Sequence, residues 1–135
     1  MKRVIIILAI VVAVFAIVAV SIVGVIPPRN LTATRMQVLK RRVLQYVQAH
    51  GELPSSLAAL QKMEGYDNSI QDGWKKEITY EVSTSGIVTF RSFGRDGVAG
   101  GSGEDADIVG SFPSHDKQGN GSDESVSWSE DPLQK

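Results

Sequence analysis

The longest feature of the hydrophobic pattern is an uncharged run from Val4 to Ile26, in which only Ser21 and Gly24 interrupt the apolar side chains. As a helix that rises about 1.5 Å per residue, this run covers a hydrocarbon core about 30 Å thick. It therefore predicts a transmembrane helix over residues 4–26, with residues 1–3 as a short stub. A cleaved signal peptide is the alternative, but its apolar region normally spans only about 7–15 residues.

A second helix is predicted after Pro27 and Pro28, because each proline lacks an N–H and interrupts the first helix. Gly51 is the expected terminator, and the helix should run to about Ala49. Three side chains can cap its start: Asn30, Thr32 and Thr34. Apolar residues recur at three- and four-residue spacing, which indicates a core-facing stripe. The stripe consists of Met36, Leu39, Val43 and Tyr46 or Val47, opposite Lys40, Arg41 and Gln45.

The next part of the chain predicts a short helix and an antiparallel hairpin. Pro54 and the two serines after it open the short helix, whose apolar positions are Leu57, Leu60 and Met63. Apolar and polar residues then alternate over 78–82 and 87–92, with a turn between them. Trp74, just before the hairpin, is expected to anchor the core. The fold class is therefore α+β, with a helix packed on a small antiparallel sheet over residues 29–112.

The composition changes after Phe112. Residues 113–135 are rich in Ser, Asp, Glu and Gly, and their only large apolar residues are Val126, Trp128 and Leu133. Such a segment offers too little apolar surface to offset its ordering entropy, so it is predicted to be a disordered acidic tail. A short docking motif around Trp128 is the alternative.

Composition and charge exclude several classes of function. With 135 residues, one folded domain is expected, and a net charge of −1 gives no field for nucleic acid. The absence of cysteine removes disulfides and thiolate metal sites. His50 and His115 are far apart in sequence and lie in no catalytic motif. We therefore expect neither an enzyme nor a binder of nucleic acid or of a small-molecule substrate.

The residues that follow the hairpin favour calcium chemistry. Five of the ten residues from Gly94 to Gly103 are glycine, and carboxylates lie among and just after them. Calcium takes about 6–8 oxygens from carboxylates and backbone carbonyls, and glycine allows the tight folding that brings them together. The expected ligands are the side chains of Asp96, Glu104, Asp105 and Asp107 and the carbonyls of Phe93 and Val98. The EF-hand and β-helix nonapeptide patterns both fail here, and an acidic glycine loop that binds nothing is the alternative.

Three stretches resemble the G-type (major) pseudopilins of type II secretion systems. The sequence S-F-G-R-D-G at 92–97, followed by a glycine-rich spacer and D-A-D-I at 105–108, is similar to the family's calcium loop. D-G-W-K at 72–75 resembles its D-P-W-G element, with glycine in place of proline and lysine in place of glycine. Residues 51–60, G-E-L-P-S-S-L-A-A-L, are similar to the family's G-x-Y-P-T-T-x-x-x-L-x-x-L segment. Together these stretches place the similarity at roughly residues 35–112.

The resemblance implies a pilin-like fold and a structural or accessory role in a type II secretion or type IV pilus-related apparatus. It also implies a single-pass protein of the bacterial inner membrane with a cytoplasmic N-terminus, a periplasmic domain, and lipid and other pseudopilins as partners. The basic residues after the span oppose this orientation under the positive-inside rule. Residues 1–26 also lack the family's prepilin peptidase site, a glycine and phenylalanine followed by a glutamate. A stand-alone membrane-tethered calcium-binding module and a secreted domain are the remaining alternatives.

Overall fold

The computed structural model describes residues 6–7, 10, 26–115, 122 and 126–129. The predicted stub at 1–3 and nearly all of the predicted transmembrane helix at 4–26 lie outside this part of the chain. Among the described residues, the structure contains no helix with the length and apolar character needed to cross a membrane.

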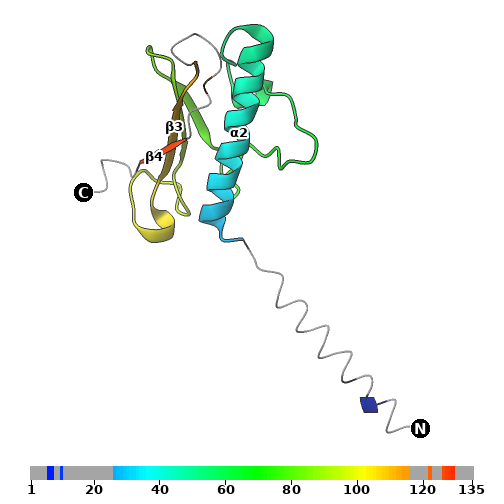
Figure 1. Ribbon diagram of the computed structural model, residues 1–135. Helices are drawn as coiled ribbons and strands as arrows, with labels where there is room; N and C mark the ends of the chain where they lie inside the picture. The colour runs from blue at the N-terminus through cyan, green and yellow to red at the C-terminus, as the bar shows by residue number, and fades with distance from the viewer. Residues whose placement is uncertain (1–5, 8–9, 11–25, 116–121, 123–125, 130–135) are drawn as a thin grey trace.

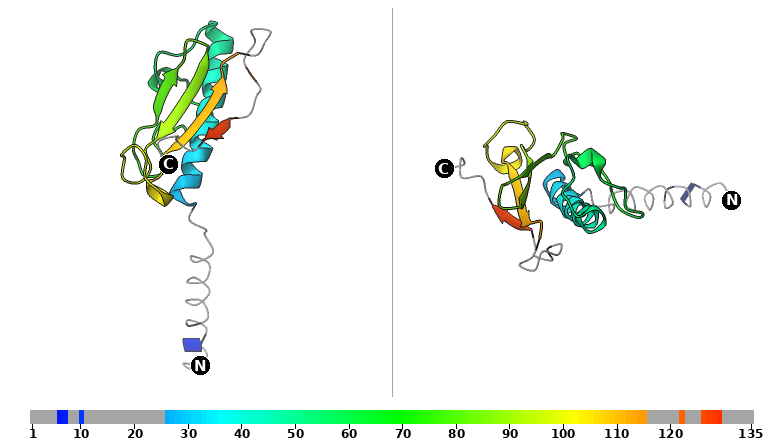
Figure 2. Two further views of the ribbon diagram at one scale, coloured as in Figure 1. Left: turned by 90° about the vertical axis from the view of Figure 1, so that its left-hand side faces the viewer. Right: turned by 90° about the horizontal axis from the view of Figure 1, so that it is seen from above.

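The domain consists of one long helix on a four-stranded antiparallel sheet, so the α+β prediction is confirmed (Figure 1). Helix α2 spans Pro28–His50, and the strands lie in the order β1-β2-β3-β4. Their bounds are Thr79–Val82, Ile87–Ser92, Ile108–Pro113 and Ser127–Ser129. The view from above in Figure 2 shows helix and sheet as two layers.

Helix α2 starts earlier than predicted and ends as predicted. Pro28 occupies the first turn, where its missing N–H costs nothing, and none of the described side chains caps the helix. The predicted capping by Asn30, Thr32 or Thr34 is therefore wrong. The Thr32 and Thr34 hydroxyls instead donate to carbonyls four residues earlier, at 2.8 and 2.9 Å. Gly51 ends the helix in a left-handed conformation with φ 74°, and its N–H donates to the Val47 carbonyl at 2.8 Å.

The predicted apolar stripe of α2 packs into the core. On the opposite face, one of the three residues predicted to be polar and exposed is buried instead. Buried side chains of the stripe pack with apolar residues of the sheet: Met36, Leu39, Val43 and Val47 with Val88, Phe90, Ile108 and Phe112. Arg41 and Gln45 are exposed as expected. Lys40 is buried, contrary to the prediction, and its ammonium lies 5.6 Å from the centre of the Phe112 ring. Its aliphatic stem and this cation–π contact explain why a lysine is tolerated there.

The segment between α2 and the sheet contains less helix than predicted. Only a single 3₁₀ turn forms, η1 at Leu57–Ala59, because Leu60 already has an extended backbone. Trp74 is partly buried against the core, as predicted. The hairpin is confirmed, with Tyr80 opposite Phe90 in the β1–β2 register.

The end of the chain corrects the prediction of a disordered tail at residues 126–129. Strand β4 pairs with β3, and Val126 just before it is a buried core residue. Gly110 of β3 makes room for them, since a Cβ there would lie 2.8 Å from Val126 and 2.9 Å from the Trp128 ring. Two apolar side chains that alternate with serine are therefore enough for a strand when β3 provides the partner. Residues 116–121, 123–125 and 130–135 of the predicted tail lie outside the described residues.

Candidate metal-binding loop

The predicted metal site lies in residues 93–107, which we call the glycine–carboxylate loop. It connects β2 to β3 and contains one 3₁₀ turn, η2 at Gly103–Asp105. The loop lies at the same end of the domain as the start of α2, as Figure 2 shows. Arg29 in the first turn of α2 connects the two, because its Nη1 donates to the carbonyls of Gly103 and Ala106 at 3.1 and 3.2 Å.

Two glycines allow the halves of this loop to pack backbone against backbone. Gly94 and Gly101 both have positive φ, at 63° and 83°. A Cβ on either residue would lie 2.5 or 2.6 Å from the carbonyl oxygen of Asp105, closer than any real contact. The glycine-rich composition is therefore a requirement of this tight fold.

Two of the three predicted ligands in the first half of the loop bond to the loop's own backbone. Asp96 is exposed, and its Oδ1 accepts a hydrogen bond from the Val98 N–H at 3.0 Å. The Phe93 carbonyl accepts from the Gly97 N–H at 3.1 Å. Val98 is 63% exposed. These contacts form a local turn.

The carboxylates of the second half contact arginines. Asp105 forms a two-pronged pair with Arg95, through Nε at 2.8 Å and Nη2 at 3.0 Å, and Glu104 lies 3.9 Å from the same guanidinium. The Arg95 hydrogen bond holds the pKa of Asp105 below its ordinary value, and the same contact raises the pKa of Arg95. Asp107 is only 1% exposed. Its Oδ2 lies 3.1 Å from Arg91, and its Oδ1 accepts from the Gly100 N–H at 3.2 Å.

As placed, these residues do not fit a calcium ion. Calcium needs several oxygens that converge on one point. Within the described ranges, no three acidic or histidine side chains are grouped so that they could hold a metal. Asp105 and Asp107, the central ligands of the hypothesis, are instead directed at different guanidinium groups. Calcium binding stays a prediction from the sequence.

Sequence reasoning missed the buried carboxylate that supports the loop. Asp72 is fully buried, and its Oδ1 accepts from the N–H groups of Trp74 and Lys76, both at 2.9 Å. Its Oδ2 accepts from the Ser92 hydroxyl at 2.6 Å, at the end of β2 where the loop begins. The D-G-W-K element marked this position, but nothing in the local pattern pointed to Ser92, 20 residues away.

The chain differs from the D-P-W-G element at two positions, with Gly73 in place of proline and Lys75 in place of glycine. A Cβ on Gly73 would lie 2.1 Å from the Pro28 carbonyl oxygen, so the close approach of α2 leaves space for glycine alone. Lys75 stands where the family pattern has glycine, and it has a positive φ of 68°. A lysine there holds a backbone conformation that glycine adopts freely.

A buried arginine of α2 fixes the segment that leads to the D-G-W-K element. Arg42 of α2 is only 4% exposed and donates to the carbonyls of Leu60, Gln61 and Asn68 at 2.9, 2.9 and 3.1 Å. Burial lowers the pKa of its guanidinium, and the three carbonyls compensate in part for the lost hydration.

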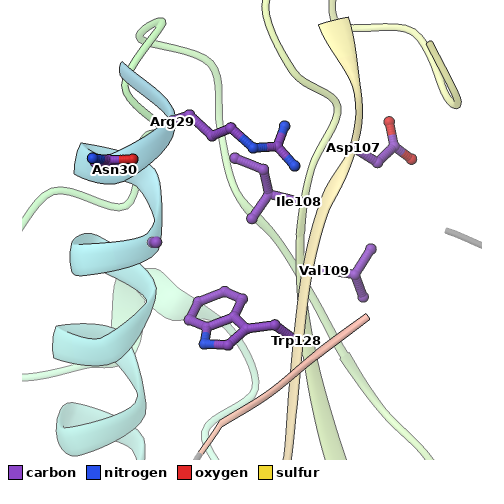
Figure 3. A pocket seen from close by; sticks show the side chains of 7 residues that line it. Arg29, Asn30, Asp107, Ile108, Val109 and Trp128 are labelled. Carbon is purple, nitrogen blue, oxygen red and sulfur yellow. The ribbon is translucent and has the colours of Figure 1, made fainter. Parts of the chain in front are cut away.

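A cavity of about 330 Å³ lies between the first turns of α2 and strands β3 and β4 (Figure 3). Trp128 and Ile108 point toward the helix, and Arg29 extends from the helix toward β3. The carboxylate of Asp107 points away from this space, on the other side of β3. Asp107 is nevertheless one of the residues that line the cavity, so the cavity borders the second half of the loop.

Comparison with known families supports the resemblance seen in the sequence. The family model for type II secretion system protein G matches residues 29–111. The chain belongs to this family. The match to the protein G family begins in the first turn of α2 and ends within β3, so β4 lies outside it. Searches of curated proteins and of solved structures gave no match.

Proposed function

We propose that this chain is a membrane-anchored structural or accessory subunit of a type II secretion apparatus, with its helix-and-sheet domain in the periplasm. The observation that carries the proposal is the match to the protein G family over residues 29–111, which spans nearly all of α2, strands β1 and β2 and the first part of β3. The role is assembly without catalysis. Its partners are the other pseudopilin-like components and the lipid of the inner membrane.

The membrane anchor in this proposal is the apolar run that precedes α2. Val4–Ile26 has the length of a bilayer span, and α2 begins two residues later at Pro28. Alkaline carbonate washing of native membranes should leave the protein in the pellet. A reporter fused after Lys135 should be active outside the cytoplasm, and activity in the cytoplasm would contradict the proposed orientation.

An accessory role fits this chain better than that of the bulk filament subunit. The resemblance implies a glutamate in the apolar helix that pairs with the N-terminal amine of a neighbouring subunit. Residues 1–26 contain no acidic side chain, so this pairing cannot form. Because a buried acid is costly unless it is paired, such a pair fixes the register of neighbouring helices. We therefore expect no filaments built from this chain alone.

Site-specific cross-linking in native membranes tests the proposed role. Photo-reactive residues at exposed positions of the domain, such as Gln48, should capture other pseudopilin-like components of the same apparatus, identified by mass spectrometry. A matched strain in which the assembly platform is deleted should lose these products. Membrane-bound protein without cross-links to any secretion component would refute the proposal and favour a stand-alone tethered module.

Calcium stabilisation of the outer domain is a separate hypothesis that this role does not require. An ion at Asp105 and Asp107 would have to compete with Arg95 and Arg91 for the carboxylate oxygens. The result of the cross-linking experiment does not depend on that competition. Calcium binding and the role in a secretion apparatus can therefore be tested independently.

A further inference from the structure

The glycine–carboxylate loop contains the kinds of oxygen that a calcium ion takes, and side-chain cations already contact them. Arg95 holds both oxygens of Asp105, at 2.8 and 3.0 Å. Arg91 contacts Asp107 at 3.1 Å, and that carboxylate is buried. Both arginines lie on the loop or on the strand that leads into it, so the same stretch of sequence supplies the acids and their counter-ions.

Four backbone carbonyls of the loop also accept hydrogen bonds from side-chain cations. Arg29 reaches from the first turn of α2 to the carbonyls of Gly103 and Ala106. Lys76, just before the hairpin, donates through Nζ to the carbonyl of Gly94 at 3.4 Å and to that of Arg95. Cations from three separate parts of the domain therefore converge on one loop.

The negative charges of the loop's carboxylates are equal in number to the positive charges of the side chains that contact the loop. The loop has four carboxylates, and four cationic side chains contact its oxygens: Arg29, Lys76, Arg91 and Arg95. Calcium sites gain affinity from uncompensated carboxylate charge. Among the residues that the structure describes, the loop's carboxylates and the cations that contact the loop therefore leave no net negative charge for a divalent ion. Such an ion would have to displace bonds that already exist.

We propose that side-chain cations close this loop in place of calcium, so that the folded domain is stable without the ion. A guanidinium suits this task because its fixed fork of N–H donors matches a carboxylate and keeps its charge at any physiological pH. The inference concerns the domain by itself and holds whether or not the chain joins a secretion apparatus.

Calcium titration of the full-length chain in mild detergent tests the proposal. Isothermal titration calorimetry of the wild-type protein should show no binding of calcium ion. Its thermal midpoint should be the same with saturating calcium chloride and with a chelator. A binding heat or a higher midpoint in calcium, either of which disappears in Asp105→Asn, would overturn the proposal.

Removal of the cations provides the second arm. The double variant Arg91→Gln/Arg95→Gln should melt at a lower temperature than wild type and should recover part of that loss when calcium is added. The matched control is Arg41→Gln/Lys62→Gln, which removes the same charge at exposed positions outside the loop. The control should keep a calcium-independent midpoint. A double variant no less stable than this control would also overturn the proposal.

A conservative variant separates geometry from charge. Arg95→Lys retains the positive charge but loses the fork that contacts both oxygens of Asp105. Its midpoint should lie between those of wild type and Arg95→Gln. A midpoint equal to that of Arg95→Gln would show that the charge contributes nothing to closing the loop.

Discussion

Two irregular segments of this domain are fixed to the helix and sheet by opposite means. In residues 60–76, which we call the Asp72 segment, two buried charged groups, Asp72 and Arg42 of α2, hold the backbone through neutral partners. Asp72 accepts from two N–H groups and a hydroxyl, and Arg42 donates to three carbonyls. In the glycine–carboxylate loop, charges pair with each other. Arg95 and Asp105 have 59% and 32% of their side chains exposed, whereas the Asp107 carboxylate that pairs with Arg91 is buried.

The difference shows where stability is concentrated. A buried charge that loses its hydrogen bonds cannot recover them from water, so its removal or the removal of its partners is costly. An exposed ion pair exchanges its partner for solvent at little loss, and salt screens it. The Asp72 segment should therefore respond strongly to single substitutions, while the exposed Arg95–Asp105 pair should be weakened by added salt.

The largest effect is expected for Asp72→Ala. The substitution leaves two backbone N–H groups and the Ser92 hydroxyl without their acceptor. Loss of this buried network should destabilise the domain by about 3 kcal/mol. Urea unfolding of the full-length chain, followed by tryptophan fluorescence, measures it. Asp72→Asn is the control, because its side-chain oxygen can still accept from the backbone, and it should lose clearly less. Equal losses would show that the charge, not the hydrogen bonds, matters.

The next effect is expected for Arg42→Met, which keeps an aliphatic side chain of similar reach. Three carbonyls of the Asp72 segment lose their donor, and the predicted loss is about 2 kcal/mol. Gln48→Met, at an exposed position of the same helix, should change stability by less than about 0.5 kcal/mol. The same urea titration compares the two variants, and a loss no greater than that of Gln48→Met would mean that the buried arginine contributes little.

A gain in stability is predicted for Lys75→Gly. Lys75 has a positive φ of 68°, a conformation that glycine adopts without strain. Relief of this strain, less the extra backbone entropy of glycine when unfolded, should stabilise the domain by about 1 kcal/mol. Lys75→Ala removes the side chain but keeps the strain, so it should give no gain. If alanine stabilises as much as glycine, the lysine side chain and not its backbone is unfavourable.

The smallest effect is expected for Asp67, a charged residue of the Asp72 segment that is not buried. Asp67 pairs with Arg35 at 2.7 Å, but 48% of the Asp67 side chain is exposed, so the pair should behave like the exposed Arg95–Asp105 pair of the loop. Asp67→Asn should cost only about 0.5 kcal/mol at neutral pH.

The pH dependence of that variant has a defined sign. The Arg35 hydrogen bond holds the pKa of Asp67 below its ordinary value. The pair therefore contributes its full stability above the unfolded pKa, about 3.9, and loses it as the pH falls through the folded pKa. Unfolding of wild type and Asp67→Asn at neutral and acidic pH should show their difference closing in acid. A difference that persists at the lowest pH would rule out the ion pair as its source.

The elements with local periodic patterns were predictable. The α2 stripe, the Gly51 terminator and the hairpin each depend on residues within a few positions of one another. Strand β4 was not predictable in this way, because composition averaged over 23 residues concealed the alternation of Val126 and Trp128. Its partner Gly110 comes from a strand whose packing is visible only in the folded domain.

The candidate site was predictable in its position but not in its contacts. The glycines and carboxylates marked the loop, and the structure brings Asp105 and Asp107 to buried or half-buried positions within it. The prediction considered which acids could meet and overlooked the cations interleaved with them. Arg95 and Arg91 are close in sequence to these acids, so their contacts are local, whereas the contacts of Arg29 with the loop span 74 and 77 residues. The roles of Asp72 and Arg42 also depend on long-range contacts.

The close approach of Gly73 to Pro28 has a mechanical consequence. Next to it, Thr32 accepts a hydrogen bond from the Gly73 N–H at 2.8 Å, and the neighbouring Asp72 bonds to Ser92 at the end of β2. A pulling force applied at the first turn of α2 is therefore transmitted directly to the sheet through these contacts between distant parts of the chain. It does not have to be transmitted along the helix axis. Pulling on residues N-terminal to Pro28 should shear this junction first, and Thr32→Val should lower the force at which the domain yields.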